Sequence, residues 1–152
     1  MIETPQIVRT TEQRTAMIAI RIPASEIRSA MGDGLKELHA ALGAQGVSQN
    51  GPWFTHHLRQ PSDTFDFEIH LPIESEIKPV GRVVPGHWPE MTVARTVYHG
   101  GYEGLGSAWG EFLGQIADQA TADDLWEVYS VGPEAGSDAS LYRTQLNKPL
   151  KD

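Results

Sequence analysis

Hydrophobic residues recur at helical spacing in two segments of the chain. Apolar side chains three and four positions apart form one stripe in each segment, at Ile27, Met31, Leu35, Leu38 and Leu42, and again at Leu105, Trp109, Phe112 and Ile116. This spacing is typical of an amphipathic helix that packs one face against a core. Gly43 and Gly46 offer an end to the first stripe. The pattern therefore predicts two amphipathic helices, one in each half of the chain.

Runs of β-branched and aromatic residues surround the two predicted helices. Residues 6–22 are long enough for one or two strands, and further strands are predicted at 51–60, 64–73, 91–100, 125–131 and 141–150. Val83 and Val84 add part of a strand in the connector between the halves, which contains several Pro and Gly residues. Each half thus has the order strand, helix, strand, strand.

The repeated order of elements predicts a duplicated module. The endings EIHLPI (68–73) and QLNKPL (145–150) can be aligned on Pro72 and Pro149. We predict an α+β fold of duplicated β-α-β-β type, with a mainly antiparallel sheet and two helices. The chain, 1–152, would then be one domain made of half-repeats at about 6–75 and 80–150, with a central ligand cleft between them.

Composition narrows the range of partners. The chain has 152 residues with 39% hydrophobic content, which suits one folded domain. Its net charge of -8 argues against binding to DNA or RNA, because that affinity comes mainly from Lys and Arg. No apolar run approaches the roughly 20 residues that span a bilayer, and the amino terminus is too polar for a signal peptide. Cysteine is absent. We therefore expect a cytoplasmic protein that contacts neither membrane nor nucleic acid.

The predicted strand LWEVYSV (125–131) contains an acidic residue among apolar and aromatic ones. Side chains alternate along a strand, so Glu127 and Tyr129 point to the same face. An unpaired carboxylate in apolar surroundings is costly, and a tyrosine offers both an apolar ring and a hydroxyl. Glu127 is therefore either a ligand-binding residue or an ordinary one, facing solvent on an edge strand or bonded to Arg or backbone.

The segment TVYHGGYEGLGSAWGEFLGQI (96–116) resembles the strand, turn and second helix of the GyrI-like small-molecule-binding domain. This domain also occurs as the effector-binding domain of AraC-type and MerR-type regulators, and its fold is a duplicated, SHS2-like β-α-β-β unit. FDFEIHLPI, WEVY and TQLNKPL add to the resemblance. Relatives commonly have a His, a basic residue, Gly and Pro before the Tyr, whereas here the four residues are 98–101, YHGG. The role of that His is not carried over.

The resemblance implies a function for the predicted cleft. It implies a pocket of aromatic side chains around one acid that accommodates bulky, planar and often cationic aromatic compounds, and it places Glu127 there. A cation above aromatic faces and beside a carboxylate is favourably placed. Since the chain has no room for a helix-turn-helix segment, we expect a stand-alone small-molecule-binding protein for aromatic ligands, with multidrug binding as the broader class.

Further candidates for this pocket come from aromatic and imidazole side chains. Tyr98 and Tyr102 lie at the predicted turn before the second helix, where they can close one end of the cleft, and Tyr102 matches the family better. His56, Trp88 and Phe54 are also candidates, with Trp88 as a lid or rim residue in the irregular PGHWPE. Core packing is the alternative for each aromatic residue, and Trp109 is expected in the core.

The sequence gives little indication of a metal or a cofactor. His56 and His57 are adjacent on a strand and point to opposite faces, so they cannot bind one ion together. Glu68 and His70 share a face with Asp66, a weak set of ligands. No GxGxxG or P-loop pattern is present. We therefore expect no metal and no cofactor.

An enzyme is the alternative function. Some stand-alone GyrI-like proteins hydrolyse cyclopropanoid alkylating natural products, and the resemblance would make Glu127 and Tyr129 catalytic, with Glu127 activating water and a tyrosine polarising the substrate carbonyl. No nucleophile triad suggests another hydrolase. Other relatives bind DNA gyrase, but the sequence has no interface signal, so any protein partner is unknown.

Overall fold

The computed structural model describes residues 1–133 and 136–151. The described elements are β1 (Gln6–Arg9), β2 (Gln13–Pro23), η1 (Ala24–Glu26), α1 (Ile27–Ala44), β3 (Phe54–His57), β4 (Thr64–Pro72), β5 (Val84–Trp88), β6 (Thr92–His99), η2 (Tyr102–Gly104), α2 (Leu105–Gln115), β7 (Leu125–Val131), η4 (Ala139–Leu141) and β8 (Arg143–Pro149), where η marks a 3-10 turn. Both helices follow the apolar stripes, and residues 6–22 form two strands. No helix among the described residues is long and apolar enough to cross a bilayer.

One eight-stranded sheet joins the two halves of the chain. Its strand order is β1-β6-β8-β7-β3-β4-β2-β5, and every pairing between these strands is antiparallel. The order is symmetric about the contact between β3 and β7, with β3-β4-β2 on one side and β7-β8-β6 on the other. The α+β fold with a mainly antiparallel sheet and two helices, consistent with the GyrI-like fold, is confirmed.

The edge strands β1 and β5 cross between the halves. β1 pairs with β6 of the second half, and β5 pairs with β2 of the first half. If the half-repeats meet at about residues 75–80, each edge strand pairs with a strand of the other half-repeat. The duplication itself stays a prediction.

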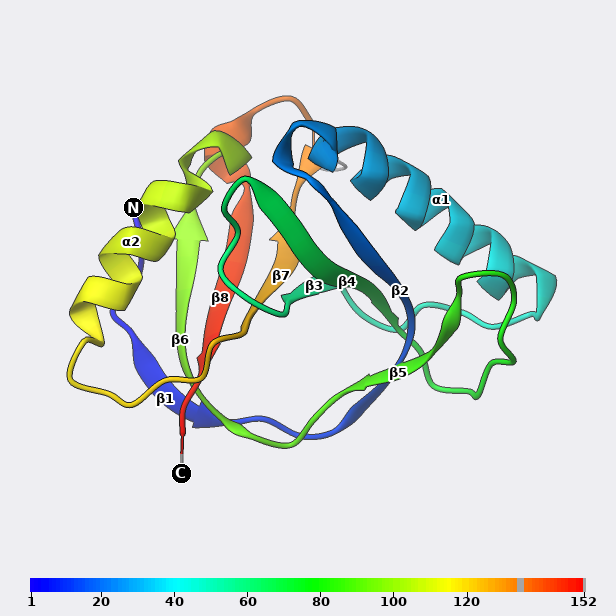
Figure 1. The fold of residues 1–152 in the computed structure, drawn as a ribbon, viewed down its shortest axis with the longest axis horizontal. Coiled ribbons are helices and arrows are strands. Elements are labelled where there is room, and N and C mark those ends of the chain that lie inside the picture. Colours follow the sequence, from blue (N-terminus) through cyan, green and yellow to red (C-terminus); the bar gives the residue numbers. More distant parts are fainter. Residues whose placement is uncertain (134–135, 152) are drawn as a thin grey trace.

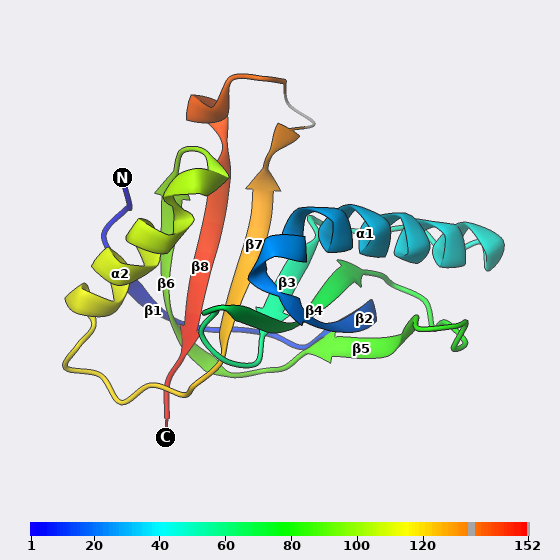
Figure 2. The ribbon, with the colours of Figure 1, turned by 45° about the horizontal axis from the view of Figure 1, so that its top comes forward.

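The helices cover the same face of the sheet. The apolar stripe of α1 packs on β2 and β4, with Leu38 and Ile69 fully buried, while Phe112 of α2 and Leu146 of β8 belong to a second buried cluster. Figures 1 and 2 show α1 and α2 standing apart on either side of β7. Each helix thus has its own core, and the centre of the sheet between them lies under neither.

The register of the central strands determines which polar and aromatic side chains lie on each face of the sheet. Thr55 is directly opposite Glu127, and His56 is opposite both Glu68 and Trp126. Directly opposed residues share a face, and neighbours along a strand do not. The face towards the helices therefore carries Thr55 and Glu127, and the other face carries His56, Glu68 and Trp126.

Candidate ligand-binding cleft

A cleft of about 950 Å³ lies between α1 and α2 on the helix-covered face. Such a volume is typical of sites for small molecules. Its lining is mainly apolar and aromatic, and consists of Ile27, Arg28, Met31, Leu35, Trp53, His57, Gln60, Pro61, Phe65, Tyr102, Glu103, Leu105, Gly106, Trp109, Leu125, Glu127, Tyr129, Pro133 and Tyr142. The central ligand cleft expected from the sequence is present.

Glu127 is the acidic group on the floor of this cleft, and only 7% of it is exposed. The indole N–H of Trp109 donates to its Oε2 at 2.6 Å, and the Tyr129 hydroxyl donates to its Oε1 at 2.6 Å. Because the Tyr129 proton is committed to Glu127, the hydroxyl of Thr55, 2.8 Å away, donates to the Tyr129 oxygen. β7 lies in the interior of the sheet, so Glu127 is not on an edge strand, and in the part of the chain that the structure describes no Arg bonds to it.

The hydrogen bonds to Glu127 come from neutral donors, which satisfy its oxygens without cancelling its charge. The nearest imidazole nitrogen, Nε2 of His57, is 3.8 Å from Oε1. Burial lowers the pKa of His57 below its ordinary 6.5, although the charge of Glu127 acts in the other direction. Within residues 1–133 and 136–151, no Lys or Arg forms an ion pair with Glu127. The cleft therefore has a negative charge at its floor.

Aromatic rings surround this carboxylate. The rings of Trp53 and Tyr129 stack with centroids 4.1 Å apart, and Tyr102 meets Tyr129 edge-on at 5.9 Å. Tyr102 also contacts Tyr142 at 5.5 Å. Stacked and edge-on rings are pre-formed apolar walls that keep their geometry without a ligand. The cleft can therefore hold a bulky aromatic molecule against Glu127.

The turn before α2 positions Tyr102. Tyr98, in β6, is buried and donates its hydroxyl to the carbonyl oxygen of Gly101 at 2.8 Å, so it holds the turn and does not line the cleft. Gly100 has a φ of 143°, which favours glycine, and the Tyr98 ring leaves no room for a side chain at Gly104. The glycines of HGGYEG thus allow the chain to close over Tyr98 and present Tyr102.

Three predicted cleft residues lie on the opposite face of the sheet. Phe54 and His56 alternate with Thr55 and His57 along β3, and the alternation points His57, not His56, into the cleft. Trp88 lies in β5 and packs on Phe54, with ring centroids 5.0 Å apart. The structure therefore corrects the expected placement of Phe54, His56 and Trp88, while it places Glu127, Tyr129 and Tyr102 in the cleft.

Some residues that line the cleft were not predicted from the sequence. His57 is buried and lines the cleft, and among the described residues its buried Nδ1 has no hydrogen-bond partner. Trp53 and Tyr142 fall within the predicted strands 51–60 and 141–150, but in the structure each lies just before its strand, where side-chain alternation does not fix its direction. For His57 the strand period shows only that residues 55 and 57 share one face of β3. The register that pairs Thr55 with Glu127 is needed to show that this face is the cleft face.

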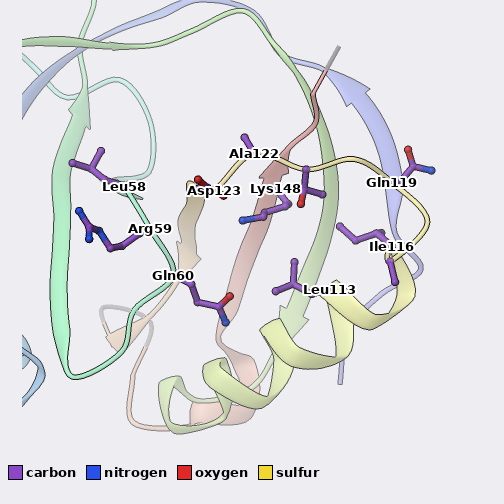
Figure 3. A pocket seen from close by; sticks show the side chains of 11 residues that line it. Leu58, Arg59, Gln60, Leu113, Ile116, Gln119, Ala122, Asp123 and Lys148 are labelled. Atoms are coloured by element: carbon purple, nitrogen blue, oxygen red, sulfur yellow. The ribbon is translucent and has the colours of Figure 1, made fainter.

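A second hollow of about 650 Å³ adjoins the far end of α2. Figure 3 shows Leu113 on α2, Gln60 on the segment after β3, and Lys148 on β8 between them. Gln60 lines both hollows, so they are neighbours. The aromatic rings and Glu127 belong to the first hollow alone, which makes it the stronger candidate for a ligand site.

Comparisons with known proteins identify the fold. No model of a known protein family matches the chain, and no curated protein matches it. Among solved structures, the C-terminal domain of EcmrR matches with a TM-score of 0.83 and 16% identity, over 98% of this chain and 98% of that one. In the complex of EcmrR with DNA, the chain spans 57% of the EcmrR chain at the same TM-score and identity.

Two more solved structures share the fold. A hydrolase encoded by lin2189 from Listeria innocua matches with a TM-score of 0.69 and 10% identity, over 97% of this chain and 91% of that one. SAV2435 bound to tetraphenylphosphonium matches with a TM-score of 0.65 and 8% identity, over 98% and 94%. At such identities the likeness establishes a common fold and leaves ligand and activity open.

Proposed function

We propose that the protein binds bulky aromatic cations in the cleft between α1 and α2, with Glu127 as the group that selects for positive charge. The observation that carries this proposal is the buried carboxylate, which accepts hydrogen bonds from Trp109 and Tyr129 but has no ion pair with Lys or Arg within residues 1–133 and 136–151. An uncompensated charge in such surroundings is costly without a ligand and favourable beside a cation. The site is therefore suited to a ligand that brings the missing charge.

The aromatic walls add to the same preference. A cation over the face of a tryptophan or tyrosine gains about 0.5 to 2 kcal/mol, more when water is excluded. Trp53, Tyr102 and Tyr129 supply such faces next to Glu127. SAV2435, which shares the fold, is bound to tetraphenylphosphonium, a cation with four aromatic rings, and this supports the proposal by analogy of fold.

Titration followed by tryptophan fluorescence tests the proposal. Tetraphenylphosphonium and tetraphenylborate have the same shape and opposite charges, so their difference in affinity measures charge selection. We expect the cation to bind more tightly, and Glu127→Gln to weaken its binding by about 10- to 100-fold, the effect of losing a charge-assisted contact. Glu103→Gln, at an exposed position of the cleft lining, is the matched control and should change affinity little. Equal binding of both ions by the wild type would remove Glu127 from this role.

Hydrolysis of cyclopropanoid compounds is the second candidate function. The specific observation in its favour is the Tyr129 hydroxyl at 2.6 Å from Glu127, an acid and a phenol adjacent in one cleft. In this mechanism Glu127 would deprotonate a water molecule that opens the strained ring, and a tyrosine hydroxyl would stabilise the carbonyl oxygen. Mass spectrometry for the hydrated product distinguishes the two functions. Turnover should fall by about 10²- to 10⁴-fold in Glu127→Gln, and a tightly bound substrate recovered unchanged would leave binding alone.

On this proposal residues 1–152 act as one effector-binding domain, in the cytoplasm, with a small aromatic molecule as its partner. Size-exclusion chromatography with bound ligand, together with fractionation of the native cells, tests this part. A stable complex with nucleic acid under the same conditions would contradict it.

A further inference from the structure

The face of the sheet away from the helices carries a second cluster of titratable side chains. Glu68 of β4 lies directly opposite His56 of β3, and His70 follows Glu68 by two residues on the same face. His56 stacks on Trp126 with ring centroids 3.8 Å apart and planes 10° apart, and His70 stacks on Phe54 at 4.7 Å and 11°. The two imidazoles are thus held in fixed orientations by aromatic rings.

Both imidazoles converge on one oxygen atom. His56 Nδ1 is 3.0 Å and His70 Nε2 is 2.9 Å from Oε1 of Glu68. The three atoms lie within 4.8 Å of one another. Around a zinc ion, with bonds of about 2.1 Å, neighbouring ligand atoms are about 3.0 to 3.4 Å apart. The two nitrogen–oxygen separations, 3.0 and 2.9 Å, are close to this geometry, and the two imidazole nitrogens lie within 4.8 Å of each other.

The remaining nitrogen of each imidazole also has a partner. His56 Nε2 is 2.7 Å from Oδ2 of Asp124, and His70 Nδ1 is 2.7 Å from the hydroxyl of Thr15. Metal-binding histidines almost always have such a partner, which fixes the ring and the tautomer. Asp66, the other acid on this face of β4, contacts Arg59 at 3.3 Å and is not part of the cluster.

We propose that His56, Glu68 and His70 bind a divalent transition-metal ion, with Zn²⁺ as the reference ion, and that Asp124 and Thr15 orient the two imidazoles. The ion would take the place of the imidazole protons that now face Glu68. Two imidazole nitrogens and one carboxylate oxygen are a ligand set that Zn²⁺ accepts, with a further position open to water. The side chains of His56 and Glu68 are 15% and 21% exposed, so an ion can enter from solvent, whereas His70 is buried.

The proposal is independent of the cleft, because the cluster lies on the other face of the sheet. Its rival is a purely structural role, in which two imidazoles satisfy a half-buried carboxylate by hydrogen bonds. The two differ in one measurable respect. A ligand set of this kind binds one Zn²⁺ tightly, and a hydrogen-bonded cluster binds it no better than scattered surface histidines.

Competition with a chromophoric zinc chelator tests the site on the full chain after removal of metal with EDTA. We expect one Zn²⁺ per chain, a large loss of affinity in Glu68→Gln and in His56→Gln, and a loss of about 10- to 100-fold in Asp124→Asn, which removes only an orienting partner. His39→Gln is the matched control, because His39 is exposed on α1 and should not change the affinity.

Thermal unfolding supplies a second readout that does not depend on the chelator. Zn²⁺ should raise the Tm of the wild type and of His39→Gln, and leave the Tm of Glu68→Gln unchanged, because binding to the folded state alone stabilises it. Circular dichroism before each measurement verifies that a variant is folded. Equal zinc affinity in the wild type and Glu68→Gln, or no Tm shift in the wild type, would overturn the proposal.

Discussion

The two faces of the sheet each hold a carboxylate on a strand near its centre, but they satisfy it differently. On the cleft face, Glu127 accepts from an indole and a phenol, both neutral. On the other face, Glu68 faces two imidazoles. Neutral donors satisfy the oxygens and leave the negative charge, whereas imidazoles can carry a positive charge or give up their protons to a metal ion.

The difference extends to the electrostatics of each carboxylate. Burial acts to raise the pKa of Glu68, but the bonds from His56 and His70 outweigh it and lower the pKa to about 2. Glu127 has its nearest imidazole nitrogen, on His57, at 3.8 Å, and burial lowers the pKa of that imidazole. The same side-chain type therefore suits an organic cation on one face and a metal ion on the other.

The largest expected effect comes from measuring the affinities for both ligands in both carboxylate variants. Glu68→Gln should abolish zinc binding and leave the affinity for tetraphenylphosphonium unchanged. Glu127→Gln should weaken the binding of tetraphenylphosphonium by about 10- to 100-fold and leave zinc binding unchanged. The sites lie on opposite faces, and in residues 1–133 and 136–151 no hydrogen bond or ion pair joins Glu68 to Glu127, so their effects should be independent. Chelator competition and fluorescence titration measure the two affinities. A variant that loses both ligands would show that the faces are coupled.

Buried threonine hydroxyls give a matched pair for stability. Thr55 hydrogen-bonds Tyr129 on the cleft face and Thr15 hydrogen-bonds His70 on the other, and both residues are fully buried. Thr55→Val and Thr15→Val each keep the shape of the side chain and leave a buried acceptor unsatisfied, so each should cost about 1 to 3 kcal/mol of unfolding free energy.

Thr144→Val is the control for this pair. Its hydroxyl is buried without a hydrogen-bond partner among the described residues, so the substitution removes no bond and should be neutral or stabilising. Urea denaturation of the three variants measures the free energies. If Thr144→Val costs as much as the other two, packing and not hydrogen bonding explains all three values.

The aromatic walls of the cleft predict a smaller effect on affinity. Trp53→Leu removes the ring stacked on Tyr129 and should weaken tetraphenylphosphonium binding by about 0.5 to 1.5 kcal/mol, the usual contribution of an aromatic contact. Phe54→Leu is the control, because Phe54 is the next residue in the chain but packs on the opposite face. Isothermal titration gives both affinities. Equal losses in the two variants would contradict the assignment of faces.

Sequence patterns predicted the positions of helices and strands better than they predicted which face of the sheet each side chain occupies. The stripe of α1 and the strand LWEVYSV matched their elements closely, because period and composition are local properties. The pairing of β1 with β6 and of β5 with β2 was not predictable, since neither strand contains information about its partner. Long-range pairing depends on which edges of the finished sheet remain free.

The site shows the same limit. Glu127 and Tyr129 lie two residues apart in one strand, so their proximity followed from the strand period alone. The direction of β3 required its register against β7, and without that register His56 was assigned to the cleft in place of His57. The proposed metal ligands show the same limit. The strand period predicted that Glu68 and His70 share a face, but only the pairing of β3 with β4 brings His56 next to them.

The smallest expected effect concerns Tyr129 at alkaline pH. Burial, together with the negative charge of Glu127, raises the pKa of Tyr129 well above its ordinary value of 10.0. Above about pH 10 the unfolded chain therefore releases this proton while the folded chain keeps it, so the folded state binds more protons and the free energy of unfolding falls as pH rises. Tyr129→Phe removes this contribution. The difference in stability between wild type and variant should be constant below about pH 9 and shrink by on the order of 0.5 kcal/mol between about pH 10 and 10.5, since one proton corresponds to about 1.4 kcal/mol per pH unit. Urea denaturation at stepped pH measures the difference. Parallel curves through pH 10.5 would mean that Tyr129 ionises in the folded protein as readily as in the unfolded chain, which would contradict its burial beside Glu127.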